Sequence, residues 1–63
     1  MTIGEKLREL RGKKIRKTVA EELGITESSL SNYENNYRIP RDEIKKRIAN
    51  YYKVSVESIF IAE

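Results

Sequence analysis

Four short polar side chains share one side of a helix that the sequence predicts between Thr26 and Asn35. At 3.6 residues per turn, Leu30 and Tyr33 define the inward face of this segment. The outward face then carries Glu27, Ser28, Ser31 and Asn32. An Asn amide can bridge N6 and N7 of adenine, a carboxylate accepts from N4 of cytosine, and a hydroxyl is permissive. These residue types could recognise base edges in DNA, although the helix dipole alone also favours Glu27 in a first turn.

Basic residues flank this segment and offer a second chemistry, the binding of phosphate. Residues 1–17 hold seven Lys or Arg against two acids, residues 18–36 hold four acids and no cation, and residues 37–63 hold six Lys or Arg against four acids. The net charge of +3 and the pI near 9.3 suggest an anionic partner. The alternative is that 37% charged residues only keep a small helical protein in solution.

The most unusual charges stand before a predicted helix over residues 16–23. Lys13, Lys14, Arg16 and Lys17 crowd an end where the helix dipole is already positive, and Ile15 takes the place of a capping Ser or Thr. Each cation there costs roughly 0.3 to 1 kcal/mol at low salt. A phosphate docked on the backbone N–H groups would turn this repulsion into attraction. Otherwise the segment is a solvated basic loop that tolerates the cost.

The elements that position these groups are five predicted helices without any strand pattern. Thr2 and Glu5 form a capping box that starts a helix over about residues 2–12, and the second helix, over residues 16–23, ends at Gly24. Thr26 caps the third, which Asn35 and Asn36 close.

Two further helices follow this trio. Pro40 opens the fourth, where a missing N–H costs nothing, and the basic run of residues 45–47 forms a solvated face. Ser55 caps a short fifth helix that carries Val56, Ile59 and Phe60. As an alternative, residues 59–61 finish as an extended tail.

Several classes of protein are excluded by what the sequence lacks. Without Cys or His there is no disulfide, no thiolate metal site and no Ser-His-Asp or Cys-His catalytic pair. We therefore expect no enzyme, no metal, no cofactor and no small-molecule ligand. No apolar run approaches the roughly 18 residues that span a membrane, so we expect a soluble, cytoplasmic protein. We also expect residues 1–63 to form one domain, with no separate sensor domain.

A small residue and a glycine stand where two crossing helices need them. Ala20 allows close approach of the helix axes, and Gly24 accepts the positive φ at which the first helix stops. The buried sides are supplied by Val19, Leu23, Ile25, Leu30 and Tyr33. This pattern over about residues 16–35 resembles the helix-turn-helix of the Cro and phage-repressor (Xre) family. The resemblance implies a compact five-helix, lambda-repressor-like DNA-binding domain whose third helix enters the major groove.

The resemblance also assigns roles to individual positions. Glu27, Ser28 and Asn32 fall at base-contacting positions, and Thr26 and Asn35 at phosphate-contacting ones. The segment 35–41 resembles a loop whose backbone amides and basic residues grip phosphate, which adds Tyr37, Arg38 and Arg41 to Arg16 and Lys17. Glu34 matches an acidic residue that tethers the motif to the rest of the domain.

A monomer on one half-site makes few contacts for a specific regulator, so we expect a homodimer on a palindromic operator. Its interface is predicted at the C-terminal side, from Tyr52, Ile59, Phe60 and Ile61. The function expected is a transcriptional repressor on double-stranded DNA, and activation through contact with polymerase is equally possible chemically. The alternative is an antitoxin or protein-interaction module of the same fold, which the acidic middle of the chain favours.

Overall fold

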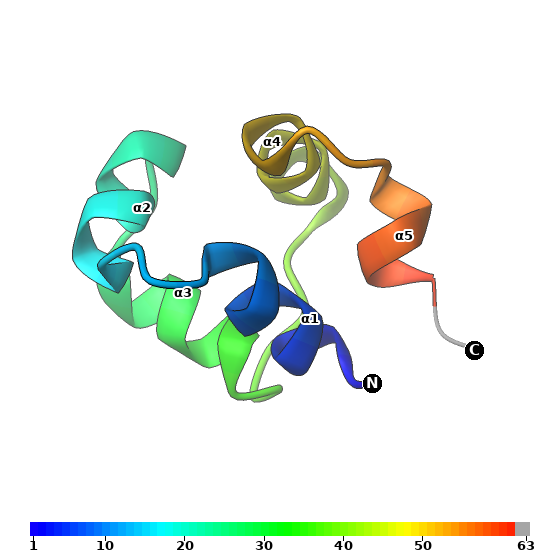
Figure 1. Cartoon of the computed structure of the whole chain (residues 1–63), viewed down its shortest axis with the longest axis horizontal. Helices are drawn as coiled ribbons and strands as arrows, with labels where there is room; N and C mark the ends of the chain where they lie inside the picture. The colour runs from blue at the N-terminus through cyan, green and yellow to red at the C-terminus, as the bar shows by residue number, and fades with distance from the viewer. Residues whose placement is uncertain (62–63) are drawn as a thin grey trace.

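Five α-helices and no strand make up residues 1–61, the part of the chain that the computed structural model describes. The helices are α1 (Ile3–Arg11), α2 (Arg16–Leu23), α3 (Glu27–Glu34), α4 (Asp42–Tyr52) and α5 (Val56–Phe60) (Figure 1). The all-α, five-helix prediction is confirmed, and the alternative of an extended tail over residues 59–61 is wrong for Ile59 and Phe60. No helix within residues 1–61 is long and apolar enough to cross a membrane.

The helix starts follow from short polar side chains. The hydroxyl of Thr2 accepts from the backbone N–H of Glu5 at 3.1 Å, and the Glu5 carboxylate accepts from the N–H of Thr2 at 2.8 Å. These bonds to Thr2 also hold the pKa of Glu5 below its usual value. The hydroxyls of Thr26 and Ser55 accept from the backbone N–H groups of Ser29 and Ser58 at 3.0 and 3.1 Å, so all three predicted caps are confirmed. Pro40 does not open α4 as predicted, since it is buried one residue before the N-cap.

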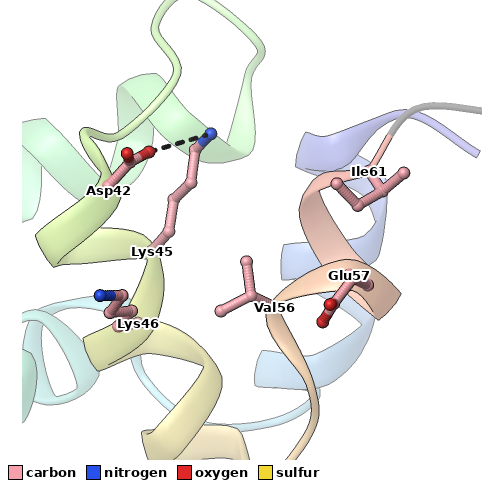
Figure 2. Close-up of a pocket in the computed structure, with 6 residues that line it drawn as sticks. All are labelled: Asp42, Lys45, Lys46, Val56, Glu57 and Ile61. Carbon is pink, nitrogen blue, oxygen red and sulfur yellow. Dashed lines mark ion pairs between the residues drawn. The ribbon is translucent and has the colours of Figure 1, made fainter.

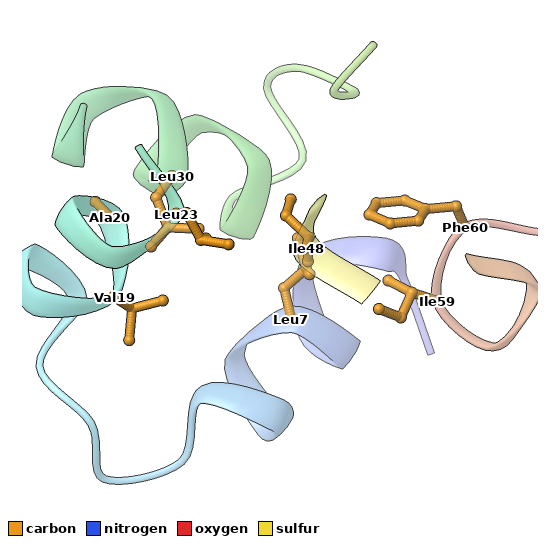
Figure 3. Packing of buried hydrophobic residues seen from close by; sticks show 8 residues of the cluster. All are labelled: Leu7, Val19, Ala20, Leu23, Leu30, Ile48, Ile59 and Phe60. Atoms are coloured by element: carbon orange, nitrogen blue, oxygen red, sulfur yellow. The ribbon is translucent and has the colours of Figure 1, made fainter. Parts of the chain in front are cut away.

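The core joins residues from all five helices. Its buried side chains are Leu7, Val19, Ala20, Leu23, Leu30, Ile48, Ile59 and Phe60 (Figure 3). Between α2 and α3 the turn has the predicted geometry: Gly24 is left-handed at φ 77°, and the N–H of Ile25 donates to the carbonyl of Ala20 at 3.0 Å. Ala20 is only 1% exposed, as expected for a residue at a close helix crossing.

A second close approach, between α1 and the end of α3, had no counterpart in the sequence predictions. A Cβ atom at Gly4 would lie 2.2 Å from the backbone oxygen of Glu34, so only glycine fits at this position. Asn36, with φ at 63°, accepts from the N–H of Gly4 at 2.9 Å through its side-chain oxygen. Its amide nitrogen donates to the Thr2 hydroxyl at 3.1 Å. Asn36 thus binds the loop after α3 to the start of α1.

The basic run on α4 is only partly the solvated face that we predicted, because Lys46 and Arg47 are exposed whereas Lys45 is not. Arg47 donates from Nη1 to the carbonyl of Leu23 at 3.1 Å, which satisfies an orphan acceptor at the end of α2. Lys45 is half-buried, with its Nζ 5.7 Å from the centre of the Phe60 ring. Both side chains therefore attach α4 to other elements of the fold.

Candidate nucleic-acid interface

The outward face of α3 carries the four polar residues predicted for base recognition. Leu30 is fully buried, which turns the other side of the helix to solvent. Glu27 and Ser28 are exposed, whereas Ser31 and Asn32 are half-buried at the edge of this face. The fold therefore leaves all four at least partly accessible.

Ser31 and Asn32 differ in whether their side chains already form hydrogen bonds within the fold. The hydroxyl of Ser31 accepts from the side-chain amide of Asn35 at 3.2 Å, and the same amide donates to the Ser31 carbonyl at 2.9 Å. The side-chain amide of Asn32 forms no hydrogen bond with any residue among 1–61. Asn32 is consequently better able than Ser31 to bind a base edge.

The N-terminus of α2 lacks the groups that normally stabilise a helix start. Ile15 is the N-cap, no side chain caps the helix, and its first turn has no acid. Lys13, Lys14 and Lys17 are exposed around it, and Ile15 itself is 70% exposed. The first backbone N–H groups of a helix have no partner within it. This end of α2 therefore offers both N–H donors and cations to an anion.

The loop between α3 and α4 presents side chains rather than backbone. The N–H groups of Tyr37 and Arg38 both donate to the carbonyl of Asn32, at 2.9 and 3.3 Å. These two amides are therefore occupied, and the backbone grip expected from the family resemblance is not available at them. The side chains of Tyr37, Arg38 and Arg41 are exposed, so cations still line this side of α3.

A fully buried carboxylate joins α1, α2 and α3 beneath these surfaces. Glu34 accepts from Arg11 Nε at 2.7 Å, from Arg11 Nη2 at 3.1 Å and from Arg16 Nε at 3.1 Å. Its side chain has no exposed surface. The hydrogen bonds to Glu34 raise the pKa of Arg11. The tethering role expected for Glu34 is confirmed, whereas the second arginine was not foreseen.

The two neighbouring tyrosines of α4 have different surroundings. The hydroxyl of Tyr51 donates to the Glu22 carboxylate, and Lys14 lies 5.0 Å from the centre of its ring. The hydroxyl of Tyr52 is buried and has no hydrogen-bond partner among residues 1–61. Burial, with the nearby charge of Glu34, raises the pKa of Tyr52 to about 12.

The C-terminal residues divide between core and surface. Ile59 and Phe60 are 1% and 7% exposed, so they belong to the core and have no surface to offer a second subunit as predicted. Ile61 is 57% exposed and Tyr52 is half-buried. Ile61 borders a groove of about 350 Å³ between α4 and α5, lined also by Asp42, Lys45, Lys46, Val56 and Glu57 (Figure 2).

The fold and this surface together define a helix-turn-helix domain, with α2 and α3 as the crossing pair. Residues 5–59 match the model of the helix-turn-helix family, and the chain belongs to that Cro/C1-type family of DNA-binding transcription regulators. It is similar to the HTH-type transcriptional regulator ImmR of Bacillus subtilis (strain 168), with 39% identity over 59 residues. That match covers 90% of this chain and 46% of the relative, so the chain spans about half the length of the curated relative.

Proposed function

We propose that this protein regulates transcription by binding a specific DNA sequence with α3 in the major groove. Two features of α2 and α3 together support this proposal. A helix face of short polar side chains is accessible, and the helix before it keeps cations and an uncapped N-terminus at a cost to its own stability. Membership of a family of DNA-binding regulators supports the same conclusion.

Base recognition is assigned to the outward face of α3. The side-chain amide of Asn32 forms no hydrogen bond within residues 1–61. Its NH₂ group can donate to N7 of adenine while its oxygen accepts from N6, which is the pairing that suits adenine. Glu27 and Ser28, both exposed, would contact adjacent base pairs, and Ser31 would contribute through the hydroxyl it shares with Asn35.

Phosphate contacts would fix the register of α3 on the duplex. On one side lie Arg16, Lys17 and the N–H groups at the start of α2. On the other side lie the exposed side chains of the loop after α3. Tyr37, Arg38 and Arg41 belong to this second group, and Thr26 and Asn35 at the two ends of α3 complete the set. Each cation that neutralises a phosphate releases about one counterion.

We further propose that two copies bind a palindromic operator as a repressor. The groove between α4 and α5 offers both Lys46 and Glu57 beside the apolar Val56 and Ile61. A two-fold contact brings each charge of such a pair against its opposite in the second copy. The two α3 helices would then enter successive major grooves about 34 Å apart, and an occupied promoter would exclude polymerase. Equilibrium sedimentation with and without DNA tests whether the dimer forms. Finding only monomer at tens of micromolar would contradict the dimer.

The proposal is tested by selecting bound sequences from random DNA and then replacing Asn32. Selection should return a palindrome. Asn32→Ala should weaken binding to it by about 1 to 3 kcal/mol, relax the preference at one base position and leave binding to random DNA almost unchanged. Asn50→Ala is the matched control, because Asn50 is an exposed asparagine on α4. Equal losses on operator and random DNA would refute the role of Asn32, and no enriched sequence would refute specific binding.

A further inference from the structure

We propose that Glu34 positions Arg16 for DNA, by holding the Nε end of its guanidinium so that the opposite edge can grip one phosphate. In this proposal Glu34 and Arg11 act as positioning residues, and Arg16 makes the contact. The inference rests on the proposed DNA-binding function and specifies how one of its phosphate contacts is built.

The buried carboxylate of Glu34 lies beside two cations. Arg11 uses all three of its guanidinium nitrogens within the fold: Nε and Nη2 bind Glu34, and Nη1 donates to the carbonyl of Lys14 at 2.8 Å. One guanidinium in this bidentate arrangement already neutralises one carboxylate. Arg16 is therefore a second cation beside a single anion, and the cluster carries a net charge of +1.

Arg16 meets the carboxylate through only one of its guanidinium nitrogens. Its contact with Glu34 is made by Nε alone, at 3.1 Å. The Nη1 and Nη2 groups of Arg16 form no hydrogen bond to any residue among 1–61. The side chain is 33% exposed, so part of the guanidinium is open to solvent. Four of its five N–H donors remain for an anion, in the forked geometry that matches two phosphate oxygens.

Arg16 differs from its neighbour on α2 in having a partner within the fold. Lys17 is exposed and forms no ion pair with any residue among 1–61, so its side chain must be ordered when it meets a phosphate. Arg16 is already held before DNA arrives, and that part of the ordering cost is absent from its binding. If Arg16 were no longer held by Glu34, DNA binding would again include this ordering cost, which corresponds to roughly a 3- to 10-fold loss of affinity.

A double-mutant cycle measured as DNA affinity separates positioning from simple structural support. Glu34→Gln should weaken binding to operator and random DNA roughly 3- to 10-fold in the otherwise native chain. In a chain that already carries Arg16→Met, the same change should have no further effect on affinity. An equal loss in both backgrounds would overturn the proposal, because it would show that Glu34 supports the fold without acting through Arg16.

A second measurement needs no change at the buried carboxylate. In a nitrogen–proton NMR spectrum, the Nε–H signal of Arg16 should stay unchanged when DNA is added, while new Nη signals of Arg16 become visible. A shift of the Nε–H signal to the position of a solvent-exposed arginine would overturn the proposal, since Arg16 would then have left Glu34. If the native chain binds no DNA at all, the proposed function fails; if it binds DNA but either result goes the other way, only this inference fails.

Discussion

Replacing Gly4 by alanine tests the close packing of α1 against the end of α3. A Cβ at this position would lie 2.2 Å from the backbone oxygen of Glu34 and 2.7 Å from its carbonyl carbon. Both atoms belong to backbone and cannot rotate away. Normal contact distances require the two elements to separate by about 1 Å. That separation also stretches the 2.9 Å hydrogen bond from Gly4 to Asn36.

The expected loss can be assembled from these terms. Overpacking costs about 1 to 3 kcal/mol and the weakened hydrogen bond about 0.5 to 1.5 kcal/mol. Alanine returns about 1 kcal/mol through its higher helix propensity. The net loss for Gly4→Ala is about 0.5 to 3.5 kcal/mol. A domain of this size has a free energy of unfolding of roughly 3 to 9 kcal/mol, so the variant should melt roughly 2 to 28 °C lower.

Urea denaturation and thermal melting followed by circular dichroism measure this change. Ser28→Ala is the matched control, because Ser28 holds the same second position in α3 as Gly4 holds in α1 and is exposed. The control should be as stable as the native chain or slightly more so. If Gly4→Ala behaved like Ser28→Ala, the reasoning about the α1–α3 contact would be refuted.

Two further changes follow from the charges and the tyrosines. Lys17→Ala should raise the free energy of unfolding by roughly 0.3 to 1 kcal/mol at low salt, since it removes a cation from the N-terminus of α2. The same change should weaken DNA binding and flatten the salt dependence of the affinity by about one counterion. Melting and salt-titrated affinity check this pair of effects, and a loss of stability would contradict it. The pKa of Tyr52 is about 12 in the folded chain, above its ordinary value, so the unfolded chain loses this proton first. The free energy of unfolding is therefore unaffected by this ionisation below about pH 10 and falls as pH rises to about 12. Tyr52→Phe should remove this part of the alkaline loss of stability. It should also stabilise the chain by about 1 kcal/mol at neutral pH, because a buried hydroxyl without a hydrogen-bond partner disappears. Unfolding by urea from pH 7 to 12 measures both effects, and an unchanged dependence of stability on alkaline pH would count against the first.

Local signals in the sequence were sufficient to predict most of the fold. The caps at Thr2, Thr26 and Ser55 and the turn at Gly24 each depend on neighbours within five residues, so spacing alone identifies them. Gly4 and Asn36 are 32 residues apart, and nothing in either local sequence shows that they meet.

For the candidate site, sequence predicted residue types on faces but not how the fold uses them. The outward face of α3 follows from periodicity and is found as expected. The pairing of Arg16 with Glu34 and the bond from Arg47 to Leu23 depend on three-dimensional packing between helices. Ile59 and Phe60 were predicted at an interface, because an apolar residue near a chain end can lie either in the core or on a contact surface.

The buried carboxylate of Glu34 also makes the first three helices mutually dependent during thermal fluctuation. If α1 or α2 detached alone, a charged group would remain in the interior with one of its counterions withdrawn, which is strongly unfavourable. Amide protons of α1, α2 and α3 are thus expected to exchange with solvent deuterium together, as one cooperative unit. The helix assigned to base reading would then be no less protected than the scaffold that carries it.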